Sequence, residues 1–228
     1  MGNIAIIPAR GGSKRIPRKN VKDFCGEPII AYSIKAALKS GLFDEVMVST
    51  DDSEIASVSR QLGASVPFLR SAANSNDFAT TAAVLTEVLT QYQTIKKSYQ
   101  YGCCIYPTAP FTSVQKLKEA YALLNANGFD TVLPVQRFSF PIQRAFYKEQ
   151  DQISWVEPQH ALTRSQDLPQ TYHDAGQFYF FHVSSFLKSQ KLITSNSGAV
   201  EISELEGQDI DNETDWKLAE LKFRLMNS

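Results

Sequence analysis

The chain has 228 residues, enough for one sizeable α/β domain with its own core. Its 23 lysines and arginines nearly balance 24 aspartates and glutamates, so a net charge of −1 excludes a general attraction to nucleic acid or membrane surfaces. No stretch approaches the roughly 20 apolar residues of a membrane span, and the first apolar run is too short for a secretion signal. The three cysteines lack metal-site spacing, and we expect a cytoplasmic protein with reduced thiols.

Strand and helix patterns alternate along the first 137 residues. Residues 3–8, NIAIIP, form an apolar, β-branched run that is typical of a strand buried on both faces. A basic loop follows, and then a helix with Pro28 in its first turn and Gly41 at its end. The spacing of Asp51 and Glu54 predicts a capping box at the next helix. Further strands are expected at 45–50, 65–69, 101–107 and 130–138, and further helices over 78–97 and 113–128.

The alternation of strand and helix patterns ends after residue 137. Residues 138–160 predict a hairpin around Glu149-Gln150-Asp151, which could project from the sheet and pack on another subunit. An aromatic strand (176–183), an edge strand (198–204) and a final helix capped by Asn212 complete the chain. The alternation predicts an α/β fold: three α/β/α layers, Rossmann-like, with a mostly parallel sheet. We expect a single domain over 1–228 with the hairpin as an insertion.

The basic loop ARGGSKRIPRKN, residues 9–20, directly follows the first strand. Ligands of open α/β sheets bind beyond the carboxyl ends of strands, and two adjacent glycines let backbone amides approach phosphate oxygens. The loop matches neither GxxxxGK[ST] nor GxGxxG, so it predicts a third kind of nucleotide loop and disfavours an NAD-dependent oxidoreductase. A solvated basic turn is the alternative. The side chains that could bind phosphate are Arg10, Ser13, Lys14 and Lys19.

A pair of carboxylates, Asp209 and Asp211, lies just before the cap of the last helix. Mg²⁺ is usually held by one or two carboxylates together with substrate phosphates, so the pair could bind this ion. The alternative is that Asp211 only caps the helix. A triphosphate loop in the same chain favours the metal interpretation.

Five segments of the chain resemble, in type and order, the cytidylyltransferases that activate nine-carbon acidic sugars, the CMP-sialic acid synthetases and their relatives. The similarity extends over essentially the whole chain and implies a GT-A-like nucleotidyltransferase fold. The segments are IPARGGSKRIPRKN (7–20), VSTDDSEIA (48–56), YPTAPF (106–111), RSQDLPQTYHDAGQFY (164–179) and DIDNETDW (209–216).

Within this family, segment 164–179 looks most like that of the pseudaminic acid cytidylyltransferases. Sialic acid enzymes usually carry Gln at the position of Tyr106 and an NGAIY-like run where this chain has residues 174–179. The resemblance therefore implies pseudaminic acid as the acceptor. N-acetylneuraminate, legionaminic acid and the eight-carbon acid Kdo remain alternatives.

The resemblance also implies roles for individual residues. Arg10, Lys19 and Asp211 would supply the catalytic charges, and Asp209 and Asp211 would hold Mg²⁺. Arg164 would face the sugar carboxylate, which a guanidinium matches in two-point geometry. The implied CTP-binding residues are Ala9, Arg10, Gly12, Ser13, Lys14, Lys19, Asn20, Arg70 and Thr81. The implied sugar-binding residues are Tyr106, Arg164, Gln166, Tyr172, His173 and Tyr179.

The implied reaction is transfer of CMP from CTP to the anomeric hydroxyl of the sugar, with release of pyrophosphate. Such chemistry depends on positioning and on neutralising developing charge, and no side chain of the sequence stands out as a general base. A homodimer is implied by the same resemblance, with no nucleic-acid or membrane partner. A non-catalytic Rossmann-like nucleotide-binding protein is the alternative from another class.

Overall fold

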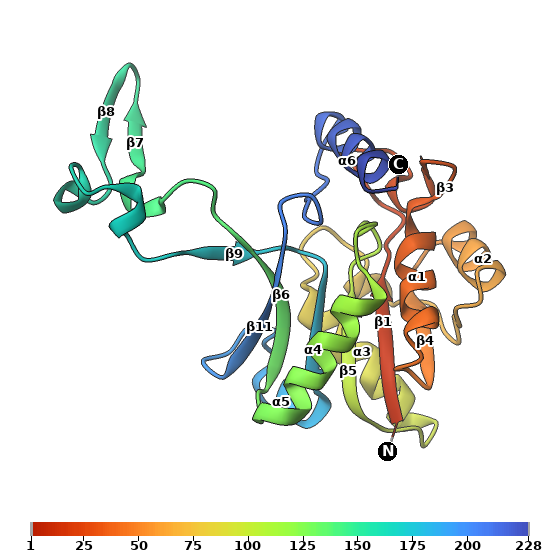
Figure 1. Ribbon diagram of the computed structural model, residues 1–228. Coiled ribbons are helices and arrows are strands. Elements are labelled where there is room, and N and C mark those ends of the chain that lie inside the picture. The colour runs from red at the N-terminus through yellow and green to blue at the C-terminus, as the bar shows by residue number, and fades with distance from the viewer. Residues whose placement is uncertain (1, 228) are drawn as a thin grey trace.

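The computed structural model describes residues 2–227, which fold around a mixed seven-stranded sheet (Figure 1). The strand order is β11-β6-β10-β5-β1-β4, and β9 pairs with β6 beyond this path. Only β10 and β9, of the strands described, run against the common direction, which confirms an α/β fold with a mostly parallel sheet. The strands are β1 (Gly2–Pro8), β4 (Glu45–Ser49), β5 (Tyr99–Ile105), β6 (Thr131–Arg137), β9 (Tyr172–Asp174), β10 (Phe178–His182) and β11 (Ser197–Ile202).

Helices cover both faces of the sheet, so alternate residues of β1 point into two different cores. Ala5 and Ile7 belong to the core under α1, α2 and α4, whereas Ile4 and Ile6 belong to the core under α3 and α5. No helix within residues 2–227 is long and apolar enough to cross a membrane. The helices are α1 (Ile29–Ser40), α2 (Ser53–Gln61), α3 (Thr81–Thr94), α4 (Val114–Asn127), α5 (Val183–Ser189) and α6 (Glu213–Met226).

A third apolar cluster lies at the carboxyl end of the sheet, where Figure 1 shows α6 above β1. It joins Ile16 of the basic loop and Ile210 of the acidic segment to Trp216 of α6. The short hairpin β2 (Asp23–Phe24) and β3 (Glu27–Pro28) adds the buried ring of Phe24. Burial of these side chains brings the segment after β1 and the segment before α6 together, and with them the basic loop and the aspartate pair.

The predicted hairpin is present as β7 (Phe146–Glu149) and β8 (Gln152–Trp155), which pair antiparallel around Gln150. We call residues 138–171 the arm. Figure 1 shows the arm extending away from the sheet, beyond β6 and β9. It exposes large apolar side chains, including Phe140 (82% exposed) and Leu162 (98% exposed).

Two local expectations are wrong. Asp52 rather than Asp51 caps α2, and its Oδ1 accepts from the amides of Glu54 and Ile55, both at 2.9 Å, so Glu54 is not at the capping-box position. Residues 65–69 make only an isolated bridge between Ser65 and Met47. The reason is that Pro67 has no N–H for the next ladder bond to β4.

Candidate active site

A cleft of about 520 Å³ opens at the carboxyl end of β1. The basic loop forms one wall, the aspartate pair another, and the segment after β5 a third, as expected for a site at this edge of an open sheet. The lining residues are Pro8, Arg10, Ser13, Lys14, Arg15, Lys19, Asn20, Asp77, Tyr106, Pro107, Thr108, Asp209 and Asp211.

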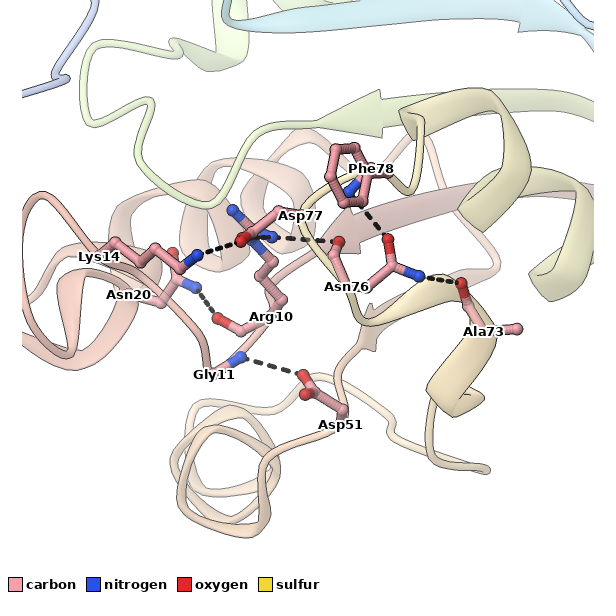
Figure 2. Close-up of polar contacts among 9 residues, drawn as sticks. All are labelled: Arg10, Gly11, Lys14, Asn20, Asp51, Ala73, Asn76, Asp77 and Phe78. Carbon is pink, nitrogen blue, oxygen red and sulfur yellow. Dashed lines mark hydrogen bonds and ion pairs between the residues drawn. The ribbon is translucent and has the colours of Figure 1, made fainter.

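The backbone of the basic loop is tied to its surroundings (Figure 2). The amide of Gly11 donates to Oδ1 of Asp51 over 3.0 Å, and the Asn20 side chain donates to the carbonyl of Arg10 over 2.9 Å. A Cβ atom on Gly11 would lie 2.8 Å from Asp52, whereas one on Gly12 would meet no protein atom within 4 Å. The loop is therefore packed at Gly11 and open at Gly12, where a ligand can approach the backbone.

Asp77 pairs with two cations of this loop. Its Oδ1 lies 2.7 Å from Nη1 of Arg10, and its other oxygen forms an ion pair with Lys14. Hydrogen bonds from Lys14 and Arg10 lower the pKa of the Asp77 carboxyl group. Both cations thus point toward one anionic group, the arrangement that phosphate binding requires.

Lys19 connects the loop to the aspartate pair. Its ammonium donates a hydrogen bond to the carbonyl of Ile210, between Asp209 and Asp211 in the chain. Burial lowers the pKa of Lys19, while the charges of Asp211 and Asp209 oppose that shift. The result is a half-buried positive charge beside two carboxylates.

The aspartate pair offers carboxylate ligands of the kind that Mg²⁺ binds. Both side chains line the cleft, and Oδ1 of Asp211 already lies 2.7 Å from a cationic group, Nη2 of Arg15. Residues 2–227 contain no group of three or more acidic, histidine or cysteine side chains that could hold a metal. Two carboxylates are what Mg²⁺ usually takes from a protein when phosphates and water supply the other ligands.

A second cavity of about 230 Å³ adjoins the cleft and shares Pro8, Arg10, Asp77 and Tyr106 with it. Arg70 and Thr81, the two residues implied to recognise cytidine, line it. Arg70 is 8% exposed, and its Nε donates to Oγ of Ser49 over 3.0 Å. A buried guanidinium with a fixed orientation can donate to the ring acceptors of a nucleobase.

Tyr106 stands between the two cavities. Its hydroxyl lies 3.4 Å from Oγ1 of Thr81, and its ring packs edge-on against Tyr179, with 5.6 Å between centroids. Burial raises the pKa of Tyr106 and of Tyr179, so both phenols stay neutral. The Tyr179 hydroxyl donates to Oδ2 of Asp174 over 2.6 Å, which fixes the ring beneath Tyr106.

Of the six residues implied for sugar binding, only Tyr106 lines the cleft of this chain. His173 lies in β9, with its ring 4.8 Å from that of Phe138. Arg164 and Gln166 belong to the arm, where Arg164 pairs with Asp167 over 2.7 Å, and Tyr172 follows at the arm's end. Ala9, which was implied for CTP binding, directly follows β1 and is fully buried where the basic loop begins.

The sequence interpretation missed two charged residues of the cleft. Arg15 belongs to the basic run, so its charge was a usable signal, yet no role was assigned to it. Asp77 lies in the polar segment 71–77, which carries no recognisable motif and reaches the site only through the tertiary fold.

The family and the fold are shown by comparison with known proteins. A cytidylyltransferase family model matches residues 4–205. Pseudaminic acid cytidylyltransferase of Campylobacter jejuni serotype O:2 is 41% identical over 99% of this chain and 97% of its own length, and CMP-N,N'-diacetyllegionaminic acid synthase of Legionella pneumophila is 32% identical over 97% and 96%. A solved structure of CMP:2-keto-3-deoxy-manno-octonic acid synthetase complexed with CTP has the same fold, with a TM-score of 0.72 at 16% identity, covering 100% of this chain and 99% of the other. The chain belongs to the cytidylyltransferase family of enzymes.

Proposed function

We propose that this enzyme transfers CMP from CTP to the anomeric hydroxyl of pseudaminic acid, giving CMP-pseudaminate and pyrophosphate. The observation that carries the proposal is one cleft in which a cationic loop faces a pair of aspartates. The acceptor is supported by the 41% identity to the C. jejuni enzyme over nearly the whole length of both chains.

The cleft's residues suit each part of this reaction. The anomeric hydroxyl attacks the α-phosphorus in line and loses its proton to solvent, the new P–O bond forms, and the bond from the α-phosphorus to the oxygen shared with the β-phosphate breaks, releasing pyrophosphate. Arg10, Lys14 and Lys19 would bind the triphosphate and stabilise charge on the leaving pyrophosphate. Arg70 and Thr81 would hold the base in the adjoining cavity, so that the α-phosphate lies near Tyr106.

Asp209 and Asp211 would hold Mg²⁺ once the nucleotide phosphates complete its ligands. When bound, the ion supplies Lewis-acid polarisation of phosphate oxygens. Arg15 pairs with Asp211, and with Asp211 on the ion its guanidinium would be available to the phosphates.

The sugar side of the site is proposed to come from two copies of the chain. Arg164 and Gln166 lie on the arm, outside this chain's cleft, and the arm exposes apolar side chains such as Leu162 that a second copy would cover. We therefore propose a homodimer in which each arm completes the neighbouring cleft. Residues 1–228 would form one domain with the arm as an insertion, and use of CTP supports a cytoplasmic location.

The acceptor is tested by measuring pyrophosphate release with CTP, Mg²⁺ and each of four sugars: pseudaminic acid, N-acetylneuraminate, legionaminic acid and Kdo. The 32% identity to the Legionella enzyme makes legionaminic acid the second candidate. We expect the highest kcat/KM with pseudaminic acid and, for a Lys19→Ala control, a kcat/KM lower by about 100-fold or more. A higher kcat/KM with another sugar would reassign the acceptor, and no release with any of them would refute the transfer reaction.

A further inference from the structure

Asp77 is an anion placed among the groups implied to bind phosphate (Figure 2). Its carboxylate contacts Arg10 over 2.7 Å and also pairs with Lys14, and Nη1 of Arg10 additionally donates to the carbonyl of Asn76 over 3.1 Å. Asp77 lines both the main cleft and the adjoining cavity. A CTP molecule with its base in the adjoining cavity and its triphosphate in the main cleft would therefore pass beside Asp77.

The segment that carries Asp77 is anchored at both sides of the carboxylate. The Asn76 side chain accepts from the amide of Phe78 over 2.8 Å and donates to the carbonyl of Ala73 over 2.7 Å (Figure 2). Farther back, Glu87 of α3 accepts from the amide and the hydroxyl of Ser71, both at 2.8 Å. The backbone thus holds the carboxylate near the loop, while the side chain itself remains open to water.

We propose that Asp77 is a counter-ion of the phosphate loop, that the triphosphate of CTP displaces it from Arg10 and Lys14, and that it limits the affinity for every ligand with a phosphate chain. The proposal rests on the proposed function, since it requires CTP to bind in this cleft. By pairing again with both cations, Asp77 favours the departure of pyrophosphate after the reaction.

The charges and exposure of the three groups support such an exchange. Exposed ion pairs contribute little free energy, so a multiply charged phosphate chain can replace one carboxylate. After the exchange, the Asp77 charge remains close to the bound phosphates and repels them, which weakens binding. Cytidine carries no phosphate and does not compete for Arg10 or Lys14, so its affinity should not depend on Asp77.

The test is isothermal titration calorimetry of the full-length protein and of Asp77→Asn with CTP, inorganic pyrophosphate and cytidine, in metal-free buffer of low salt. The matched control is Glu54→Gln, which removes an ion pair to Arg18, a cation of the same loop that does not line the cleft. We expect Asp77→Asn to bind CTP and pyrophosphate about three- to tenfold more tightly, the gain from removing a nearby like charge. Cytidine affinity, and all affinities of Glu54→Gln, should match the parent.

Other outcomes would overturn the inference in distinguishable ways. If the parent binds CTP and Asp77→Asn binds it equally or less tightly, Asp77 is not a competing counter-ion, and weaker binding would show that it orients the cations instead. If the parent binds neither CTP nor pyrophosphate, in metal-free buffer and again with Mg²⁺ added, the proposed function fails and this inference fails with it. Thermal unfolding of each variant establishes that it is folded, and Asp77→Ser serves as the second uncharged variant.

Discussion

The Lys19 ammonium donates a hydrogen bond to the carbonyl of Ile210, although 191 residues separate the two in the chain. Beside this bond, the side chains of Ile16 and Ile210 are buried in one apolar cluster. A hydrogen bond and an apolar contact thus fix the basic loop against the aspartate pair. Contacts within the protein itself hold the opposite charges of the cleft in place, and such preorganisation is what phosphate transfer needs from a protein.

Lys19→Ala should lower kcat/KM by about 100-fold or more, because it removes a preorganised charge that the other cations cannot replace from their positions. Lys19→Arg should recover part of the loss, since the positive charge is kept although the bond to Ile210 changes. Steady-state pyrophosphate release measures both variants. Equal turnover of Lys19→Ala and the parent would remove Lys19 from the mechanism.

The pH dependence should report the environment of Lys19. Burial lowers its pKa from the ordinary value of 10.5, so the folded enzyme loses this proton at lower pH than the unfolded chain. kcat/KM should therefore fall as pH rises through the lowered pKa, and Lys19→Arg should shift this alkaline limb to higher pH. Lys19 affects stability in the opposite direction. Between its folded pKa and its unfolded pKa, the unfolded chain binds more protons than the folded protein, so the free energy of unfolding should rise with pH in that range. An alkaline limb that is the same in the parent and in Lys19→Arg would contradict the assignment.

Asp211→Asn should reduce kcat/KM by about 100-fold and raise the Mg²⁺ concentration needed for half-maximal rate. The matched control is Asp215→Asn, whose carboxylate accepts from the amides of Asp211 and Asn212 at the cap of α6. This control should lower stability by about 1 kcal/mol, as loss of a cap does, and leave the Mg²⁺ dependence unchanged. Calorimetry should also detect little Mg²⁺ binding until a CTP analogue is added. Tight binding of Mg²⁺ to the nucleotide-free protein would oppose the shared site.

Alanine should lower stability at one glycine and CTP affinity at another. A Cβ on Gly102 would overlap the ring of Phe181, its partner across β5 and β10, so Gly102→Ala should cost about 1–3 kcal/mol of stability. A Cβ on Gly12 would meet no protein atom, so Gly12→Ala should unfold like the parent yet bind CTP about tenfold or more weakly. Chemical denaturation and CTP titration measure the two effects. Unchanged CTP affinity in Gly12→Ala would mean that phosphate does not approach this backbone.

The proposed dimer makes a prediction about mixed proteins. Lys19→Ala damages a cleft and Arg164→Ala damages an arm, so each variant alone should be nearly inactive. If arms act in the neighbouring cleft, refolded or co-expressed mixtures contain heterodimers with one intact site, and activity returns. Absence of recovery in a mixture shown to be dimeric would place Arg164 in its own cleft or outside the site.

Much of the fold follows from local sequence signals. The β-branched run before the basic loop, the caps at Ser113 and Asn212, and the left-handed termini at Gly41 and Gly128 all lie where the sequence predicts them. The predicted strand at 65–69 fails because one missing N–H at Pro67 outweighs its apolar pattern. Strand β9 was missed because its three residues pair only where the chain returns from the arm to β6.

Some residues of the candidate site can be predicted from local sequence, and others cannot. Arg10, Lys19 and the aspartate pair stand in recognisable segments, and the fold brings them into one cleft. Asp77 has no such signal, because its role depends on a contact across 67 residues of chain that only the tertiary structure creates. Arg164 stands in a recognisable segment, but in this chain it lies on the arm and pairs with Asp167, outside the cleft.

A crystal structure of the protein with CTP tests the central claim most directly. We expect the triphosphate to lie between Arg10 and Lys19, with the base beside Arg70, the Asp77 carboxylate turned away from Arg10, and the aspartate pair facing the phosphates. A nucleotide whose phosphates lie away from residues 10–19 would contradict the whole assignment of this cleft.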